Sequence, residues 1–145
     1  MKASWAKNPQ FIVENRAGMT EFFISLAQND GRLRRGIKFP YEEEIHPVCF
    51  CVMRLAPGQD RLDTFDKKAV VGISTVIEHR EVSLRLKLDK GNYVIVPSTR
   101  HPHQAGKFYL SIYFNGNRKN MRFSLIGHPK VLFAYSVCIG TTDAN

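Results

Sequence analysis

The sequence predicts an all-β protein, an antiparallel β-sandwich of about eight or nine strands. Hydrophobic and polar residues alternate with period two in several short runs, turn residues separate these runs, and no segment shows convincing helical periodicity. A closed barrel is the alternative architecture. The 145 residues, 43% of them hydrophobic, are enough for one domain with a real core and exclude intrinsic disorder. We expect a single domain over residues 1–145, with residues 1–7 as a linker.

The first four expected strands differ in the burial they imply. Gln10–Val13 is a short apolar opening strand, and Phe22–Leu26 alternates, although less cleanly than later runs. Val48–Met53 is continuously apolar, which suits a strand covered on both faces, and Val70–Ser74 is the fourth strand.

The remaining strands include the clearest patterns of the chain. In Val82–Leu88, branched apolar residues alternate cleanly with serine, arginine and lysine. Tyr93–Val96 is another continuous apolar run, Phe108–Phe114 and Met121–Leu125 alternate again, and Val131–Val137 completes the set.

Turn residues separate these runs. The turn signals are Asn29-Asp30-Gly31, Pro57-Gly58, Asp89-Lys90-Gly91-Asn92 and Asn115-Gly116-Asn117. Leu88 and Tyr93, on either side of the third turn, predict a β-hairpin. The longest loops are expected at Arg32–Pro47 and Ala56–Lys68, and long loops often carry function.

The charge of the chain is uneven. The formal net charge is +8, and residues 80–145 hold 10 basic and 3 acidic residues, a net charge of +7. Such an excess attracts phosphate, as lipid headgroup or nucleic acid, or simply keeps the surface solvated. Because the longest apolar stretch is Val48–Met53, no membrane span is expected, and we expect no secretory signal.

The three cysteines point to a reducing compartment. An odd number cannot form a closed disulfide framework, and Cys49, Cys51 and Cys138 all lie in apolar, strand-like contexts. We therefore expect a cytoplasmic location, with the nucleus as the alternative.

Catalytic signals are weak. Cys49 and Cys51 share one face of an apolar run, where burial raises a thiol pKa and reduces its reactivity. The sequence has neither a Gly-x-Ser-x-Gly elbow nor a phosphate-binding glycine loop. Zinc is not expected, because Cys49, Cys51 and His46 lack a second ligand pair and the His101/His103 pair is distant in sequence. An enzyme is therefore not the favoured interpretation.

Two kinds of binding site are candidates. Calcium could be held by carboxylates of two loops if these converge, although basic residues lie among them. These carboxylates are Asp60, Asp63, Asp66, Glu42, Glu43 and Glu44. No other cofactor is expected. Phosphate groups could be bound by basic residues of the second half: Arg100, His101, His103, Lys107, Arg118, Lys119, Arg122 and Lys130. Nucleic acid is not an expected partner, because the signature of an RNA-recognition fold is absent.

Several blocks resemble the C2-like β-sandwich of calpains, known as domain III. The most specific is Arg80–Val82 with Leu88–Thr99, the latter similar to the family's L-x-x-G-x-Y-x-I-V-P-S-T block, followed by Gly106–Tyr113, where Ser111 replaces the usual arginine. Weaker matches are Trp5, Asn8–Phe11, Ile24–Gln28 with Asp30 and Arg32, and Val48–Leu55. The resemblance covers residues 5–115. In this block, Gly91 permits a tight turn where a Cβ would clash, and Pro97 is expected to end the ladder.

The resemblance implies a non-catalytic regulatory or interaction domain of an intracellular cysteine protease. Neither Cys49 nor Cys51 is followed by tryptophan, so no catalytic role transfers. The family's acidic loop is reduced here to Glu42–Glu44, which counts against calcium switching. The nearest type implied is an atypical calpain of the PalB-like (calpain 7) type, linked to endosomal sorting. The implied partners are other domains of the parent protease, endosomal sorting proteins or, alternatively, an anionic phospholipid membrane bound through the basic surface.

Overall fold

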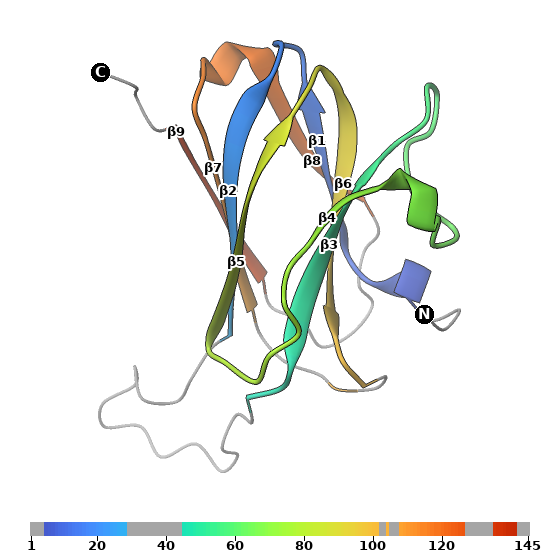
Figure 1. The fold of residues 1–145 in the computed structure, drawn as a ribbon, viewed down its shortest axis with the longest axis vertical. Helices are drawn as coiled ribbons and strands as arrows, with labels where there is room; N and C mark the ends of the chain where they lie inside the picture. The colour runs from blue at the N-terminus through green and yellow to red at the C-terminus, as the bar shows by residue number, and fades with distance from the viewer. Residues whose placement is uncertain (1–4, 29–44, 102–103, 105–107, 127–134, 142–145) are drawn as a thin grey trace.

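Nine strands form two sheets packed face to face in the computed structural model (Figure 1). The structure describes residues 5–28, 45–101, 104, 108–126 and 135–141. The strands are β1 (Gln10–Asn15), β2 (Thr20–Gln28), β3 (Val48–Arg54), β4 (Val70–Ile73), β5 (Glu81–Leu88), β6 (Gly91–Thr99), β7 (Phe108–Phe114), β8 (Met121–Ile126) and β9 (Tyr135–Thr141). Three single-turn 3₁₀ helices accompany them: η1 (Trp5–Lys7), η3 (Lys67–Ala69) and η4 (Arg118–Asn120).

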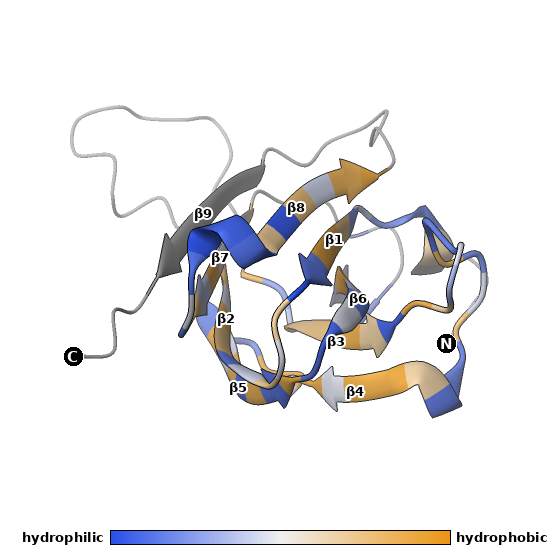
Figure 2. Cartoon of the chain, turned by 90° about the horizontal axis from the view of Figure 1, so that it is seen from above, coloured by the Kyte–Doolittle hydropathy of each residue, from blue (hydrophilic) through white to orange (hydrophobic). Residues whose placement is uncertain are grey.

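The sandwich prediction is confirmed, because the strands divide into two separate sheets and do not close into a barrel. Sheet A has the order β4-β3-β6-β1-β8, and sheet B has the order β5-β2-β7-β9 (Figure 2). Every pairing is antiparallel except that between β7 and β9. This one parallel pair corrects the fully antiparallel expectation. Since β8 crosses to sheet A and carries the chain back along the sandwich, β9 enters sheet B in the direction of β7.

The expected strands agree with the observed ones in number and approximate position. The last one was expected at 131–137, of which residues 131–134 lie outside the described part of the chain, and β9 continues to Thr141. The linker expected at 1–7 includes η1, whose Ala6 packs against buried residues of sheet A.

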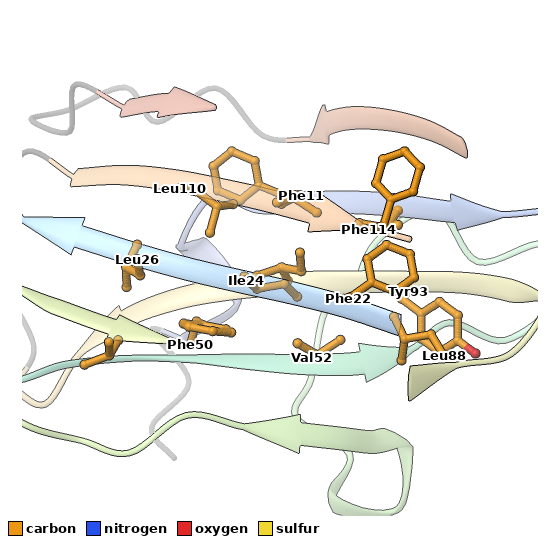
Figure 3. Close-up of a cluster of buried hydrophobic side chains, with 14 of the residues drawn as sticks. Phe11, Phe22, Ile24, Leu26, Phe50, Val52, Leu88, Tyr93, Leu110 and Phe114 are labelled. Carbon is orange, nitrogen blue, oxygen red and sulfur yellow. The ribbon is translucent and has the colours of Figure 1, made fainter. Parts of the chain in front are cut away.

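The space between the sheets is filled by large apolar side chains (Figure 3). Phe22 and Ile24 of sheet B meet Phe50 and Tyr93 of sheet A, and all four are at most 1% exposed. The rings of Phe22 and Phe114 lie 5.8 Å apart between centroids. Each such side chain contributes roughly 1.5–3 kcal/mol when fully buried, so this layer is the main source of stability.

The central strands β3 and β6 of sheet A are buried on their outer face as well. Cys51, Met53, Val94 and Val96 point away from the inner core and form a second cluster, covered by the loop that begins at Leu55. Leu55, Leu62, Phe65, Ala69 and Val70 supply that cover. The expectation that the two continuous apolar runs are covered on both faces is therefore confirmed. We call the chain from Leu55 to Ala69 the outer loop.

The hairpin predicted at Leu88–Tyr93 is wrong. β5 belongs to sheet B and β6 to sheet A, so Asp89 and Lys90 connect the two sheets. Leu88 and Tyr93 are both buried in the inner core, from opposite sheets. The sequence pattern is the same in both arrangements, because either one buries these two side chains.

Gly91 and Pro97 have the local roles expected of them, with one correction. Gly91 has φ +157°, and a Cβ there would lie 2.8 Å from the guanidinium Nη2 of Arg54, so this flexible side chain would have to shift. Pro97 does not end β6, which continues opposite β3 to Thr99. Its carbonyl accepts a hydrogen bond from the Asn8 side chain at 2.9 Å. The pairing of β6 with β1 stops before Pro97, whereas the pairing of β6 with β3 continues past it.

Candidate functional site

Basic residues gather at one end of sheet A, where the β1–β2 turn meets the β7–β8 turn. The backbone N–H of Arg16 donates to the carbonyl of Asn120 at 2.9 Å, which ties the first turn to η4. We define the basic end as Arg16, Arg118, Lys119 and Arg122. These residues, with Met121 and Phe123, line an open hollow of about 430 Å³.

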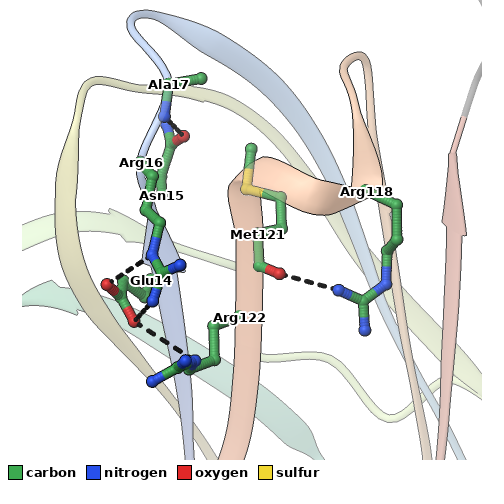
Figure 4. Close-up of polar contacts among 7 residues, drawn as sticks. All are labelled: Glu14, Asn15, Arg16, Ala17, Arg118, Met121 and Arg122. Carbon is green, nitrogen blue, oxygen red and sulfur yellow. Dashed lines mark hydrogen bonds and ion pairs between the residues drawn. The ribbon is translucent and has the colours of Figure 1, made fainter.

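Arg118 is held in place by three features of its surroundings. Asn117 caps η4 by accepting from the backbone N–H of Lys119. The Arg118 guanidinium donates to the carbonyl of Met121 at 2.8 Å (Figure 4). It also lies over the ring of Phe123, 5.1 Å from the centroid. A cation held over an aromatic face in this way is preorganised for an anion.

Arg16 and Arg122 share the carboxylate of Glu14 (Figure 4). The Arg16 Nε lies 2.9 Å from Glu14, whereas the Arg122 Nε lies 3.9 Å away. The hydrogen bond from Arg16 lowers the pKa of Glu14, which keeps this carboxylate ionised. The Glu14 carboxylate pairs with Arg16 and Arg122, so this one carboxylate does not neutralise the four cations of the basic end.

The cations lie on both faces of β8. Met121 and Phe123 face the inner core, and the Arg118 guanidinium lies on that side, over Phe123. Arg122 alternates with them and faces the other side, opposite Glu14 of β1. An anionic partner that contacts both arginines must therefore reach around the strand.

Three of the phosphate-binding candidates are brought together here, namely Arg118, Lys119 and Arg122. Sequence reasoning missed Arg16, which lies in the nearly neutral half of the chain. The sequence feature that could have pointed to Arg16 is its position before Gly18, in the turn between the first two strands.

The other basic candidates do not join them. Arg100 and His101 follow β6 at the opposite end of sheet A, since Gly91 at the start of β6 pairs with Asn15. The eight residue steps of β6 span roughly 26 Å. Arg100 and His101 therefore do not belong to the basic end. His103, Lys107 and Lys130 lie outside the described residues.

An exposed apolar side chain belongs to the same end of the molecule. Met19 follows Arg16 by three residues in the β1–β2 turn and is 64% exposed. An apolar side chain beside cations at the tip of a turn is typical of surfaces that contact anionic membranes.

Two of the three calcium candidates of the outer loop, Asp63 and Asp66, already have local partners. Asp66 caps η3 by accepting from the backbone N–H of Lys68, and Asp63 lies 3.3 Å from Arg61. Among the described residues, no group of three or more His, Cys, Asp or Glu side chains could hold a metal ion. Glu42, Glu43 and Glu44 lie outside the described part, so calcium binding stays a prediction.

Two of the three cysteines, Cys49 and Cys51, lie in β3 of sheet A. Cys51 is 2% exposed, and burial, with a smaller contribution from the neighbouring Cys49, raises the pKa of its thiol to about 11. The Cys49 sulfur lies 3.3 Å from the Ser98 hydroxyl. At neutral pH the Cys51 thiol is protonated and therefore a poor nucleophile.

The outer face of sheet B carries aromatic and small residues. The rings of Phe23 and Tyr113 lie 6.2 Å apart between centroids and are tilted by 42°, and Tyr109 is 43% exposed. Between these aromatic positions, Ser83, Ser25 and Ser111 face one another across three strands. Within the described residues, the outer cluster of sheet A has no counterpart on this face.

Comparison with known proteins is consistent with this geometry. The model of the calpain large subunit domain III matches residues 1–113. Calpain-5 of Mus musculus is 28% identical over 141 residues, covering 89% of this chain and 21% of the relative. Calpain-A of Drosophila melanogaster is 31% identical over 79% of this chain and 15% of the relative, and the calpain-2 catalytic subunit of Gallus gallus is 30% identical over 76% and 18%.

The chain thus spans about a fifth of the length of these relatives, or less. In the described residues, no helix has the length and apolar character needed to cross a membrane. The chain belongs to the family of calpain large subunit domain III, a non-catalytic domain of calpain-like proteases.

Proposed function

We propose that this domain docks onto a neighbouring domain of a calpain-type cysteine protease through the outer face of sheet B and so supports the protease core. The observation that carries this proposal is the contrast between the two outer faces. The outer loop covers the central strands β3 and β6 of sheet A, whereas Tyr109 on β7, a central strand of sheet B, is 43% exposed. Tyrosine is among the residues enriched at the centres of protein interfaces.

The composition of this face supports a folded protein as its occupant. Phe23 and Tyr113 provide apolar contact area, and the ion pair of Arg85 with Glu21 lies at the margin. The relatives are about five times longer than this chain, so neighbouring domains of one polypeptide are natural partners. Contacts between domains usually bury about 600–1,500 Å² and contain polar groups.

Substitution of Tyr109 tests this proposal in the full-length protease. Tyr109→Lys is expected to separate the calorimetric transition of this domain from that of its neighbour and to speed proteolytic cleavage between them. Ser124→Lys, an exposed position on β8 of sheet A, is the matched control and should change neither property. Identical behaviour of both variants and the wild type would overturn the proposal.

A second candidate function is peripheral binding to anionic phospholipid, favoured by the position of Met19 beside Arg16. A membrane would receive the apolar tip of the turn, while Arg16 and Lys119 attract its headgroups, each cation contributing about 1 kcal/mol. Because exposed charges are screened beyond about 8 Å at physiological ionic strength, binding should weaken with salt.

Vesicle co-sedimentation tests the membrane proposal. The chain is mixed with neutral or phosphatidylserine-containing vesicles, at low and physiological salt, with calcium or chelator. Met19→Ser should reduce binding to anionic vesicles, whereas Tyr109→Ser should not. A requirement for calcium would support the predicted site of Asp60, Asp63, Asp66 and Glu42–Glu44. Absence of binding in every condition would contradict the membrane proposal.

The finer assignments remain proposals. These are protease activity of the parent protein, its PalB-like type, endosomal sorting partners and a cytoplasmic or nuclear location. Immunoprecipitation of the full-length protein from its natural source, followed by identification of bound proteins, tests the sorting partners. Fractionation of the same cells tests the location.

A further inference from the structure

We propose that β8 accepts an extended acidic peptide segment, which adds as a strand to the free edge of sheet A. β8 is the last strand of this sheet, beyond β1, and no further strand of the described chain pairs with it. The proposal concerns a different surface from the outer face of sheet B and is independent of the docking proposed there. It rests on which backbone groups of β8 face outwards and on the cations at its start.

The hydrogen-bond alternation identifies the outward backbone groups. The Asn120 carbonyl faces β1, because it accepts from the Arg16 backbone N–H. In an antiparallel ladder the direction alternates, so Arg122 and Ser124 also bond towards β1, while Phe123 and Leu125 face the free edge. The Met121 carbonyl faces the same edge and accepts from the Arg118 guanidinium. Arg118 thus marks the point where pairing with a new strand would begin.

The side chains at this edge suit a peptide with two kinds of residue. Leu125 lies near the far end of β8, is 37% exposed, and provides an apolar contact for the part of the peptide paired with the strand. Arg118 and Arg122 lie on opposite faces near its start. Successive side chains of an extended segment point to opposite faces, so two consecutive acidic residues would meet both arginines.

This geometry favours an acidic segment over the other anions that a basic surface attracts. A flat membrane contacts one side of an edge strand at a time, whereas Arg118 and Arg122 lie on opposite faces of β8. Arg122 is only loosely paired with Glu14, at 3.9 Å, so a second carboxylate can bind it without breaking a strong ion pair. Lys119, exposed at the end of η4, extends the cationic region along the path of the peptide.

The test is a fluorescence-polarisation titration of the 145-residue chain with a labelled seven-residue peptide, in which three glutamates adjoin an alternating valine–threonine stretch. Arg118→Gln and Arg122→Gln should each weaken binding up to about five-fold, as expected for exposed ion pairs. Leu125→Pro removes an edge N–H outside the β1 ladder, at a position where an edge strand tolerates proline, and should weaken binding by about three- to ten-fold. Arg85→Gln, which removes an equal charge on sheet B, should leave binding unchanged.

Two further measurements distinguish strand addition from simple charge attraction. A peptide with N-methyl groups on the amides of its pairing edge keeps its charge but cannot add as a strand. It should therefore bind weakly even if Leu125→Pro fails to fold in a thermal melt. Equal binding of the methylated and unmodified peptides would overturn strand addition and reduce the effect to charge attraction. Competition by inorganic phosphate at concentrations matched for ionic strength with chloride, or loss of peptide binding in Met19→Ser, would also contradict the proposal.

Discussion

The two sheets of this sandwich share one inner core but differ in what lies outside it. The central strands β3 and β6 of sheet A are buried on both faces, because the outer loop covers Met53, Val94 and Val96. Sheet B turns Tyr109 outward, and no second apolar cluster covers it within the described residues. From this difference we infer that sheet A contributes mainly to the stability of the domain, whereas sheet B provides a surface for partners.

The strongest test of this comparison removes a side chain from each outer face. Met53→Ala should lower the free energy of unfolding by about 3 kcal/mol, because Met53 is fully buried and its loss leaves a cavity. Phe23→Ala on sheet B should cost less than half as much, since Phe23 is only half-buried. Urea unfolding followed by circular dichroism measures both values. Equal costs would mean that the outer face of sheet B is as important for stability as that of sheet A.

Two glutamines allow a second, similar comparison. Gln10 of β1 donates to the Leu62 carbonyl at 2.7 Å and accepts from the Leu62 N–H at 2.8 Å, which fastens the outer loop to sheet A. Gln10→Met leaves both backbone groups buried without partners and should cost about 2–3 kcal/mol.

Gln28 of β2 makes the corresponding contacts on sheet B, to the carbonyls of His46 and His79. Its surroundings are only partly buried, so water can replace the lost hydrogen bonds, and Gln28→Met should cost about 1 kcal/mol. Thermal melts of the two variants give the comparison, and a larger effect at Gln28 would reverse it.

The pH dependence of stability provides a third test of the outer layer of sheet A. The folded protein keeps the Cys51 thiol protonated up to about pH 11, whereas the thiol of the unfolded chain ionises about two pH units lower. Because the folded pKa is the higher one, this contribution is complete below the unfolded pKa and is lost as pH rises towards 11. The loss should be about 2 kcal/mol.

Denaturation curves at pH 8 and pH 10.5 measure this loss, and Cys51→Ala is the control that should show a smaller dependence. An unchanged dependence in Cys51→Ala would assign it to other groups, such as Tyr93, whose pKa burial also raises.

The smallest expected effect is on the face proposed for docking. Tyr109→Ser should change the stability of this chain by less than about 0.5 kcal/mol, because an exposed side chain makes few contacts within the fold. The same urea titration detects it. A loss above about 1 kcal/mol would show that Tyr109 stabilises its own domain, which would weaken its assignment to an interface.

Strand positions could be predicted from the sequence because alternation reports directly on burial. The continuous runs at Val48–Met53 and Tyr93–Val96 even indicated a cover on sheet A. Sheet membership could not be predicted in this way, and the supposed hairpin at Asp89–Asn92 proved to connect the sheets. The parallel pairing of β9 with β7 arises because β8, between them in sequence, belongs to the other sheet. This is a property of the whole topology.

The candidate site was predicted only in part, for a similar reason. Arg118, Lys119 and Arg122 are near one another in sequence, so composition alone grouped them. Arg16 joins them through the pairing of β1 with β8, and Arg100 is separated from them by the length of β6. Local charge counts cannot detect either relation, because both depend on strand register.

The direct connection between β5 and β6 also has a consequence for folding. Three residue steps join Leu88 to Gly91, a reach of about 11 Å when extended, close to the spacing of about 10 Å between packed sheets. The Tyr93 hydroxyl donates to the Asp89 carbonyl at 2.9 Å, which fixes this short link from inside. Neither sheet can therefore form at a distance from the other, and closing this loop costs little entropy. The slow step of folding should instead be the long-range pairing of β1 with β6, after which both sheets appear together in one cooperative transition.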